Sequence, residues 1–407
     1  MMDLTFTVSN LVLSVIVGSI LGVWIYFLAY MSKSFRLSPR LEQYHNTAIP
    51  TVTADLPYVS IILPARNEEC YISKCLNSLL SQDYPNFEII AINDSSTDRT
   101  GAIIKQYAAK DSRVVYVEAP PKPEDWAGKN WACYEGYLRS RGDLLLFTDA
   151  DTAHSSSVIS YAVGQMVSGS LDALSAVPRL ICSDFWTKIT LPALATFLYT
   201  RFSPLRVNDP KTKTGYFFGS FFIITKKTYE AVGTHAGVRH ELVEDGALGV
   251  KVKESNFRMK MVRGEEQIEA VWARDLSTLW HGLRRLMIPI YYQNKMGAYL
   301  MTVAVSFILF VPFVLVPYLL FAIFARDLSF FIFLTLELST IALIYATTAI
   351  QCIKGVFENP VYAIAAPLSG GLISLSFISA IVDAKKQGSV NWRDRRYTIR
   401  QNQHPFP

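Results

Sequence analysis

The sequence predicts an α/β domain with a mainly parallel sheet, joined to several transmembrane helices. Short β-branched runs alternate with amphipathic helical segments between about residues 58 and 150. Long uncharged runs lie on both sides of that region. The 407 residues are 51% hydrophobic and 18% charged, which is too apolar for a disordered or wholly soluble chain. We therefore expect a membrane part and a sizeable water-facing part.

Charge and cysteine content exclude two classes of protein. A net charge of +5 over 407 residues is too small for the dense basic face of a nucleic-acid-binding protein. The five cysteines are odd in number and contain no C-x-x-C pair, which argues against a disulfide framework and a zinc knuckle. We therefore expect a membrane protein without a nucleic-acid partner.

The first element is a transmembrane helix from Leu11 to Met31, within an N-terminal region of residues 1–40. This run has no charge and is long enough to cross a hydrocarbon core of about 30 Å. A cleaved signal peptide is the alternative, but no basic segment precedes the run and no small-residue cleavage site follows it. Lys33 and Arg36 follow directly, and the positive-inside rule then places the next domain in the cytoplasm.

Residues 41–275 are expected to form the α/β domain. The predicted strands are 58–63, 87–92, 114–117 and 144–148, and the predicted helices are 72–80, 103–108 and 130–139. In such a sheet, ligands bind at the carboxyl ends of the strands. The polar clusters of the sequence follow these strand ends, which predicts a binding site there.

Acidic residues follow two of the predicted strands. Asp149-x-Asp151 comes directly after a hydrophobic strand, and its oxygen ligands suit Mg²⁺ or Mn²⁺ shared with a diphosphate. A D-x-D pair alone is weak evidence, because most such pairs are solvated turn residues. Asp98 is equally explained as a helix cap. Glu244-Asp245 is a further acidic pair, or an ordinary helix start.

The ordered set of motifs is more specific than any one of them. It consists of Pro64-Ala-Arg-Asn-Glu68, Asn93-Asp94-x-x-x-Asp98, Gly128-Lys-Asn-Trp-Ala132, Asp149-Ala-Asp151, Gly219-Ser-Phe-Phe-Ile223 and Glu244-Asp245. With this set, residues 58–275 closely resemble a family 2 glycosyltransferase of the GT-A fold, which is Rossmann-like. The stretches 126–132 and 390–397 are most similar to the membrane subgroup of hopene-associated or carotenoid-type glycosyltransferases.

Three departures from the family pattern matter. Asn93 stands where the family usually has the first of two aspartates, so the nucleotide-binding site would have one carboxylate fewer than usual. The tail at 393–396 departs from the W-K-G-R-x-Y pattern of the subgroup. The Q-x-x-R-W signature of polymerising members is absent, which argues against processive polysaccharide synthesis.

The resemblance implies a role for each motif. It implies nucleotide-sugar contacts from Pro64, Ala65, Arg66, Glu68, Asp94, Lys129, Asp149 and Gly219, a metal ion (Mn²⁺ or Mg²⁺) on Asp149 and Asp151, and a catalytic pair of Glu244 and Asp245. Asp245 would be the general base for an acceptor hydroxyl, and the metal would offset the charge of the leaving diphosphate. Gly219 is also explained as a simple strand-turn glycine.

The C-terminal third of the sequence is expected to return to the membrane. Residues 276–297 carry apolar side chains at helical spacing with arginines between them, which predicts an interfacial helix or a core helix of the soluble domain. Apolar runs at 298–325, 328–353 and 361–382 are three candidate spans in a membrane region of residues 298–383.

The basic tail, residues 384–407, conflicts with that count of spans. One span before the soluble domain and three after it would place the tail outside, whereas its basic residues favour the cytoplasm. Either one C-terminal run is re-entrant, with 361–382 and its Pro367, Gly370 and Gly371 the first choice, or the charge rule fails here.

The sequence therefore predicts a membrane-bound, metal-dependent inverting hexosyltransferase. It would move a single sugar from a nucleotide-sugar, UDP-linked rather than GDP-linked, to a polyprenyl phosphate or a terpenoid-type lipid. Candidates for contacts to the acceptor or the diphosphate are Trp280, Leu283, Arg274, Arg284 and Arg285. The alternatives are a processive polysaccharide synthase and a non-catalytic module that binds or transports a glycolipid.

Overall fold

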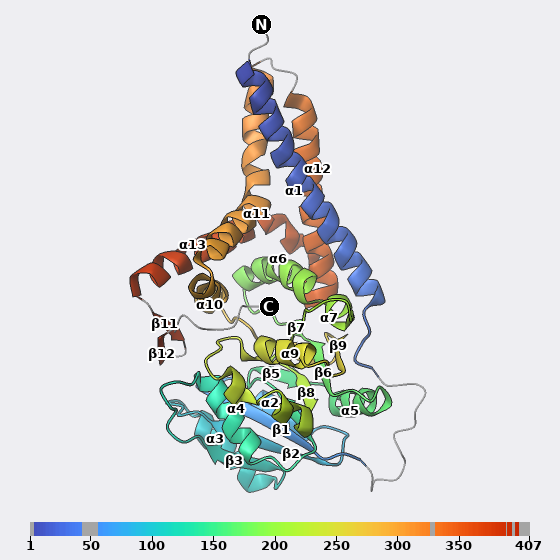
Figure 1. The fold of residues 1–407 in the computed structure, drawn as a ribbon, viewed down its shortest axis with the longest axis vertical. Helices are drawn as coiled ribbons and strands as arrows, with labels where there is room; N and C mark the ends of the chain where they lie inside the picture. Colours follow the sequence, from blue (N-terminus) through green and yellow to red (C-terminus); the bar gives the residue numbers. More distant parts are fainter. Residues whose placement is uncertain (1–3, 43–55, 326–329, 388, 393–394, 399–407) are drawn as a thin grey trace. The chain divides into compact units, whose positions relative to one another are not determined.

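The computed structural model describes residues 4–42, 56–325, 330–387, 389–392 and 395–398. The chain divides into a sheet unit (residues 38–181, 202–272 and 391–407) and a helical unit (residues 1–37, 182–201 and 273–390). Figure 1 shows the strands and helices of each unit. The predicted combination of an α/β domain and apolar helices is confirmed.

The sheet unit contains a seven-stranded sheet in the order β3-β2-β1-β4-β8-β6-β9. The strands are β1 (Val59–Ala65), β2 (Phe87–Asn93), β3 (Val114–Glu118), β4 (Leu144–Phe147), β6 (Ala173–Val177), β8 (Phe222–Thr225) and β9 (Met259–Arg263). The four strands predicted from the sequence are β1 to β4, and they pair in parallel. The sequence prediction missed β6, β8 and β9. Strands β6 and β8 are short apolar runs, which periodicity alone does not distinguish from buried helix, and β9 carries Lys260 and Arg263 and so is not an apolar run. Strand β8 is antiparallel to both neighbours.

Helices cover both faces of this sheet, as Figure 1 shows. One face packs on α2 (Ile72–Leu80), α3 (Thr100–Lys110) and α5 (Val158–Ser168), and the other on α4 (Gly128–Leu138), α8 (Lys226–Ala231) and α9 (Glu244–Glu254). Alternate residues of β1 divide between the two cores: Ile61 and Leu63 belong to the first and Ile62 to the second. Burial on both faces explains why the predicted strands are continuous apolar runs.

A smaller sheet supports the loop that follows β4. It consists of β5 (Thr152–His154), β10 (Ile268–Ala270) and β7 (Arg179–Leu180), in the order β5-β10-β7. The Val271 N–H donates to the Asp151 carbonyl at 3.1 Å. The remaining described elements outside the helical unit are α7 (Pro204–Asn208), η2 (His235–Val238) and the two-stranded sheet of β11 (Ser389–Trp392) and β12 (Arg395–Thr398).

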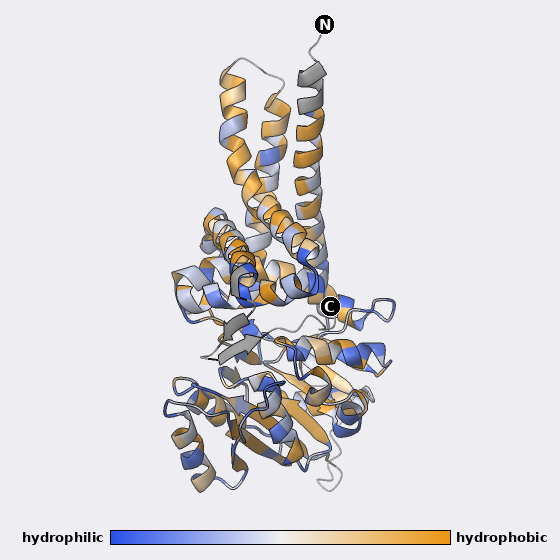
Figure 2. Ribbon diagram, turned by 60° about the vertical axis from the view of Figure 1, so that its left-hand side comes forward, coloured by the Kyte–Doolittle hydropathy of each residue, from blue (hydrophilic) through white to orange (hydrophobic). Residues whose placement is uncertain are grey.

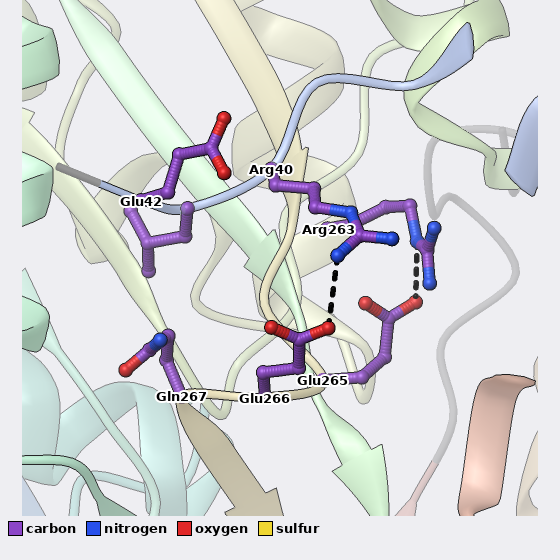
Figure 3. A pocket seen from close by; sticks show the side chains of 7 residues that line it. Arg40, Glu42, Arg263, Glu265, Glu266 and Gln267 are labelled. Atoms are coloured by element: carbon purple, nitrogen blue, oxygen red, sulfur yellow. Dashed lines mark hydrogen bonds and ion pairs between the residues drawn. The ribbon is translucent and has the colours of Figure 1, made fainter. Parts of the chain in front are cut away.

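The chain that follows the first apolar helix runs along β9 at the edge of the sheet. The Leu41 N–H donates to the Arg263 carbonyl at 2.7 Å. Figure 3 shows a cavity of about 30 Å³ beside this contact, with ion pairs between Arg40 and Glu266 (2.9 Å) and between Arg263 and Glu265 (3.2 Å). Burial raises the pKa of Glu265 to about 7, although Arg263 opposes this. The contact covers a sheet edge that would otherwise be open.

The helical unit contains four stretches that are long and apolar enough to cross a membrane, counted over the described residues. They are Asn10–Leu37, Lys295–Phe324, Phe331–Val356 and Pro360–Lys385, and they coincide with the four predicted runs. The helices of this unit are α1 (Leu4–Leu37), α6 (Phe185–Phe202), α10 (Leu276–Gln293), α11 (Lys295–Phe324), α12 (Phe331–Gln351), η4 (Cys352–Val356), η5 (Pro360–Ala365) and α13 (Ala366–Gln387). In Figure 2 the ribbons of the long helices of this unit are coloured mostly as hydrophobic.

Helix α11 continues through two prolines, Pro312 and Pro317. Pro312 has no N–H, so the carbonyl of Ile308 lacks its usual helical donor. The indole N–H of Trp24 in α1 donates to that carbonyl at 3.1 Å. A neighbouring helix thus satisfies the backbone group that the proline leaves open, which is the way membrane bundles tolerate proline.

Helix α13 crosses the lower end of α11 in Figure 1, and it packs mainly on α10 and α11. Arg284 in α10 forms an ion pair with Asp383 in α13. The Tyr292 hydroxyl donates to the Ala384 carbonyl at 2.9 Å. The last apolar run is therefore fixed along the predicted interfacial helix by polar contacts at its C-terminal end.

Candidate functional site

The loops after β1, β2 and β4 emerge at one edge of the sheet. Ala65 is paired with Asn93, so β1 and β2 end together, and β4 ends opposite Ile62, three residues before the end of β1. The residues predicted to bind a nucleotide and a metal follow these strands directly. The parallel register therefore brings them to a common site, as expected for this type of sheet.

The loops after β1 and β2 are joined through their backbones. Pro64 and Ala65 are the buried last residues of β1. The Asp94 N–H donates to the Ala65 carbonyl at 2.9 Å. The Arg66 guanidinium donates to the carbonyls of Asp94 and Ser95 at 2.7 and 2.9 Å. Arg66 thus holds the second loop against the first, a contact that sequence reasoning did not anticipate.

Two further residues of these loops are buried. Glu68 is 1% exposed, and its N–H donates to the Thr100 hydroxyl at 2.8 Å. Asn93 donates its side-chain amide to the two carboxylate oxygens of Glu118 at 3.1 and 3.0 Å. Glu118 ends β3, so the neighbouring strand supplies a carboxylate beside the position where the family pattern has an aspartate. Sequence reasoning missed Glu118, although an acidic residue at the end of a predicted strand was a usable signal.

A lysine connects the two acidic motifs. Lys129 lies in the first turn of α4, and its Nζ is 2.7 Å from Asp149 Oδ1 and 2.6 Å from Glu244 Oε1. Glu244 and Asp245 are the first residues of α9, which places them near the positive end of the helix dipole. Residues separated by about 95 positions in the sequence therefore form one charged cluster.

The carboxylate of Asp245 is held by backbone N–H groups. Its Oδ2 accepts from Gly219 at 2.6 Å, and its Oδ1 accepts from Gly246 at 2.8 Å. A Cβ on residue 219 would lie 2.7 Å from Asp245 Oδ2 and 2.9 Å from Lys129 Nζ. A side chain at position 219 would therefore displace the ends of the Asp245 and Lys129 side chains, so Gly219 leaves the space in which this cluster forms.

Burial and neighbouring charges shift the pKa values in the cluster. Burial, and next the charge of Glu244, raise the pKa of Asp245 to about 7, while Lys129 and the Gly246 N–H oppose this. Burial alone would lower the pKa of Lys129, but Asp149, Glu244 and Asp245 raise it well above its usual value. The site therefore contains a fixed ammonium and a carboxyl group that changes protonation near neutral pH, which is the range a general base needs.

The donor set at the end of β4 fits a hard divalent cation. Asp149 and Asp151 supply carboxylate oxygens from one loop, and the side chain of Asp149 is 33% exposed. The part of the chain that the structure describes contains no group of three or more metal-ligating side chains. A cation held by Asp149 and Asp151 would have to complete its shell with other oxygens, such as those of a diphosphate or water.

The acceptor candidates all lie at or near α10 in the helical unit. Trp280 and Arg285 are half-buried, and Arg274 precedes the helix. Leu283 is completely buried, and Arg284 is paired with Asp383, so both have partners inside this unit.

Comparison with known proteins agrees with the fold and the motifs. Residues 60–243 match the family described as glycosyl transferase family 2. The 4,4'-diaponeurosporenoate glycosyltransferase of Staphylococcus aureus strain MRSA252 is 27% identical over 377 residues, which cover 88% of this chain and 93% of the relative. The enzyme of the same name from strain USA300 is 29% identical over 251 residues, which cover 58% of this chain and 64% of the relative.

A solved structure shows the same fold. It is the mannosyltransferase PcManGT from Pyrobaculum calidifontis in complex with GDP-Man and Mn²⁺, with a TM-score of 0.50 and 16% sequence identity. The similarity covers 91% of this chain and 99% of that protein.

Proposed function

We propose that this chain, whose residues 60–243 form a glycosyl transferase family 2 domain, transfers one sugar from a nucleotide-sugar to a lipid acceptor with inversion. The observation that carries this proposal is the cluster of Asp149, Lys129, Glu244 and Asp245 at the ligand-binding edge of the sheet. It combines oxygen donors for a metal, a fixed cation and a carboxyl group able to act as a base.

The donor is proposed to bind in the loops after β1, β2 and β4. The backbone of Pro64 and Ala65, the buried Glu68 and the fixed Asp94 would hold the nucleotide. The diphosphate would reach Asp149 and Asp151 through Mn²⁺ or Mg²⁺, which offsets the charge that grows on the leaving group. We propose UDP- rather than GDP-linked sugar.

The chain's own residues would then serve the transfer step. Asp245 is held by two backbone N–H groups and would take the proton of an acceptor hydroxyl. Lys129 forms ion pairs with Asp149 and Glu244 in the protein alone and offsets part of their negative charge, and it lies close enough to Gly219 to face a donor phosphate or sugar. Glu244 would keep Lys129 in that place.

The acceptor is proposed to be a lipid of the terpenoid or polyprenyl phosphate type. Apolar segments long enough to span a membrane precede and follow the family 2 domain in the chain. Tethering at both ends benefits an acceptor that is confined to the membrane, through proximity and orientation. The Staphylococcus aureus relatives are named for glycosyl transfer to diaponeurosporenoate, which favours the terpenoid class. Trp280, Arg274 and Arg285 remain candidates for contacts to it, whereas Leu283 and Arg284 would do so only after losing their internal partners.

The family 2 domain is proposed to lie on the cytoplasmic side. Lys33 and Arg36 follow the first span, and the positive-inside rule places them there. Because α13 runs crosswise to α11 and packs on α10, we infer that it is re-entrant or interfacial and does not span the membrane. Three spans then bring the basic tail to the same side as the domain, which resolves the conflict in the sequence.

A donor screen tests this function. Purified protein is heated with UDP- and GDP-sugars in the presence of Mn²⁺, and unfolding is followed. A ligand at 100 times its Kd stabilises the folded state by about 2.7 kcal/mol. We expect stabilisation by UDP-sugars. Stabilisation by GDP-sugars alone would contradict the proposed donor class, and stabilisation by none of them would contradict the proposed function.

A further inference from the structure

A buried hydroxyl lies between the two loops that carry the site. Thr148 follows β4 directly and is 1% exposed. Its Oγ1 is 2.8 Å from the Ser220 carbonyl, 3.0 Å from Thr152 Oγ1 and 3.2 Å from His154 Nε2. Thr152 and His154 belong to β5, which follows the acidic loop of Asp149 and Asp151, and Ser220 belongs to the loop that contains Gly219. One side chain therefore joins both loops.

The available protons fix the direction of each hydrogen bond. The Thr148 hydroxyl donates to Ser220, and the Thr152 hydroxyl donates to the Asp149 carbonyl at 2.7 Å. Each hydroxyl has one hydrogen, so with this assignment the 3.0 Å approach of Thr148 Oγ1 to Thr152 Oγ1 is a packing contact, and the link from Thr148 to β5 is the hydrogen bond that its Oγ1 accepts from the Nε2–H tautomer of His154. Burial lowers the pKa of His154 to about 4, against the effect of the Ser220 backbone, so the ring is neutral and keeps a single N–H.

Each joined loop carries a group that the proposed reaction uses. Asp149, whose carbonyl is held by Thr152, presents its carboxylate to Lys129. Gly219, next to Ser220, donates its N–H to Asp245 at 2.6 Å. A shift of one loop relative to the other would therefore change the distance between the donor-binding carboxylate and the base, although Thr148 touches neither.

We propose that Thr148, with its hydroxyl oriented by His154, is a positioning residue that fixes the acidic loop and the Gly219 loop at the spacing needed for transfer. This inference rests on the proposed function. A misplacement of about 1 Å costs roughly 10²-fold in rate when binding is intact, which makes the effect measurable. Its signature is a loss of kcat that exceeds the loss of donor affinity.

The test compares Thr148→Val with Thr148→Ser. Valine keeps the shape and removes the hydroxyl, and serine restores it. Thr228→Val is the matched control, because Thr228 is also buried and bonded, at 2.8 Å to Thr225, but lies in α8. We expect Thr148→Val to lower kcat by about 10-fold to 100-fold with donor Kd changed less than about 3-fold, and Thr148→Ser to recover most of the rate.

Two outcomes would overturn the inference: equal kcat in Thr148→Val and Thr228→Val, or a loss that Thr148→Ser does not reverse. If Thr148→Val does not fold, His154→Phe, which removes the N–H donor to Thr148, must show the same selective loss of kcat. A wild-type protein without any transfer would contradict the proposed function itself, whereas a wild-type rate in Thr148→Val contradicts only the positioning role.

Discussion

At the scale of single residues, Lys129 is the cation that offsets part of the negative charge of the site. It pairs with two carboxylates and lies near a third, Asp245, whose pKa is raised. A metal that binds Asp149 would take over part of this neutralisation, and Lys129 would become available to a phosphate of the donor. The cluster thus holds its acidic groups together before the donor arrives.

The titration of Asp245 predicts opposite effects of pH on rate and on stability. A base must be ionised, so kcat is expected to rise with pH through a value near 7. Between its unfolded pKa and 7 the folded state binds the extra proton, so Asp245 makes the protein less stable as pH rises through that range. A pH-rate profile and thermal unfolding at pH 5 and 8 measure the two trends.

In Asp245→Asn the rise of kcat with pH near pH 7 is expected to disappear. This variant is also expected to lower kcat by at least about 10²-fold and to retain the donor affinity. Asp172→Asn is the control, because Asp172 lies beside β6 and bonds the Arg258 N–H. Turnover at the wild-type level in Asp245→Asn would mean that this carboxylate only begins helix α9.

Asp151 gives a separate prediction for the metal. Asp151→Ala is expected to weaken Mn²⁺ binding in the presence of the nucleotide-sugar by at least about tenfold, since even indirect partners of a metal contribute 10-fold to 100-fold. The Mn²⁺ affinity is measured by electron paramagnetic resonance, which detects the free Mn²⁺. Asp143→Ala, at the opposite end of β4, is the control. The same Mn²⁺ affinity in both variants would exclude Asp151 as a ligand.

At the scale of elements, Trp24 and Pro312 form a testable pair. Trp24→Phe removes the donor to the Ile308 carbonyl and is expected to cost about 0.6–1.7 kcal/mol of stability in detergent. In a Pro312→Ala background the new N–H supplies the helical partner, so the cost of Trp24→Phe should largely disappear. Equal costs in both backgrounds, measured by thermal unfolding, would show that the indole only packs.

The elements also show how far sequence reasoning reached. Strands β1, β2 and β4 were predictable because each is a buried apolar run that ends in a polar loop. The contacts of Glu118 and Thr148 were not, because strand register and loop geometry decide which residues meet. Helix α6 lies within residues 41–275, which the sequence analysis expected to form the α/β domain, but it belongs to the helical unit. One of its contacts there is the stacking of the Tyr199 ring on the Phe35 ring, with 4.7 Å between the ring centroids. Nothing in its sequence alone identified that partner.

At the scale of the whole molecule, the membrane topology depends on whether α13 crosses the membrane. If α13 does not span, Cys70 in the sheet unit and a cysteine introduced at Gln403 in the tail lie on the same side of the membrane. Labelling of single-cysteine variants in sealed vesicles with an impermeant maleimide is expected to modify both or neither. Modification of only one would show that α13 crosses the membrane.

The most direct test of the account follows the sugar itself. The full-length protein is incubated with a labelled nucleotide-sugar, Mn²⁺ and a membrane lipid extract, and the products are analysed by mass spectrometry. We predict a lipid product heavier by one sugar unit, formed by the wild type and absent with Asp245→Asn. Label found only in free sugar, in a water-soluble acceptor or in a chain of many sugars would contradict transfer of a single sugar to a lipid.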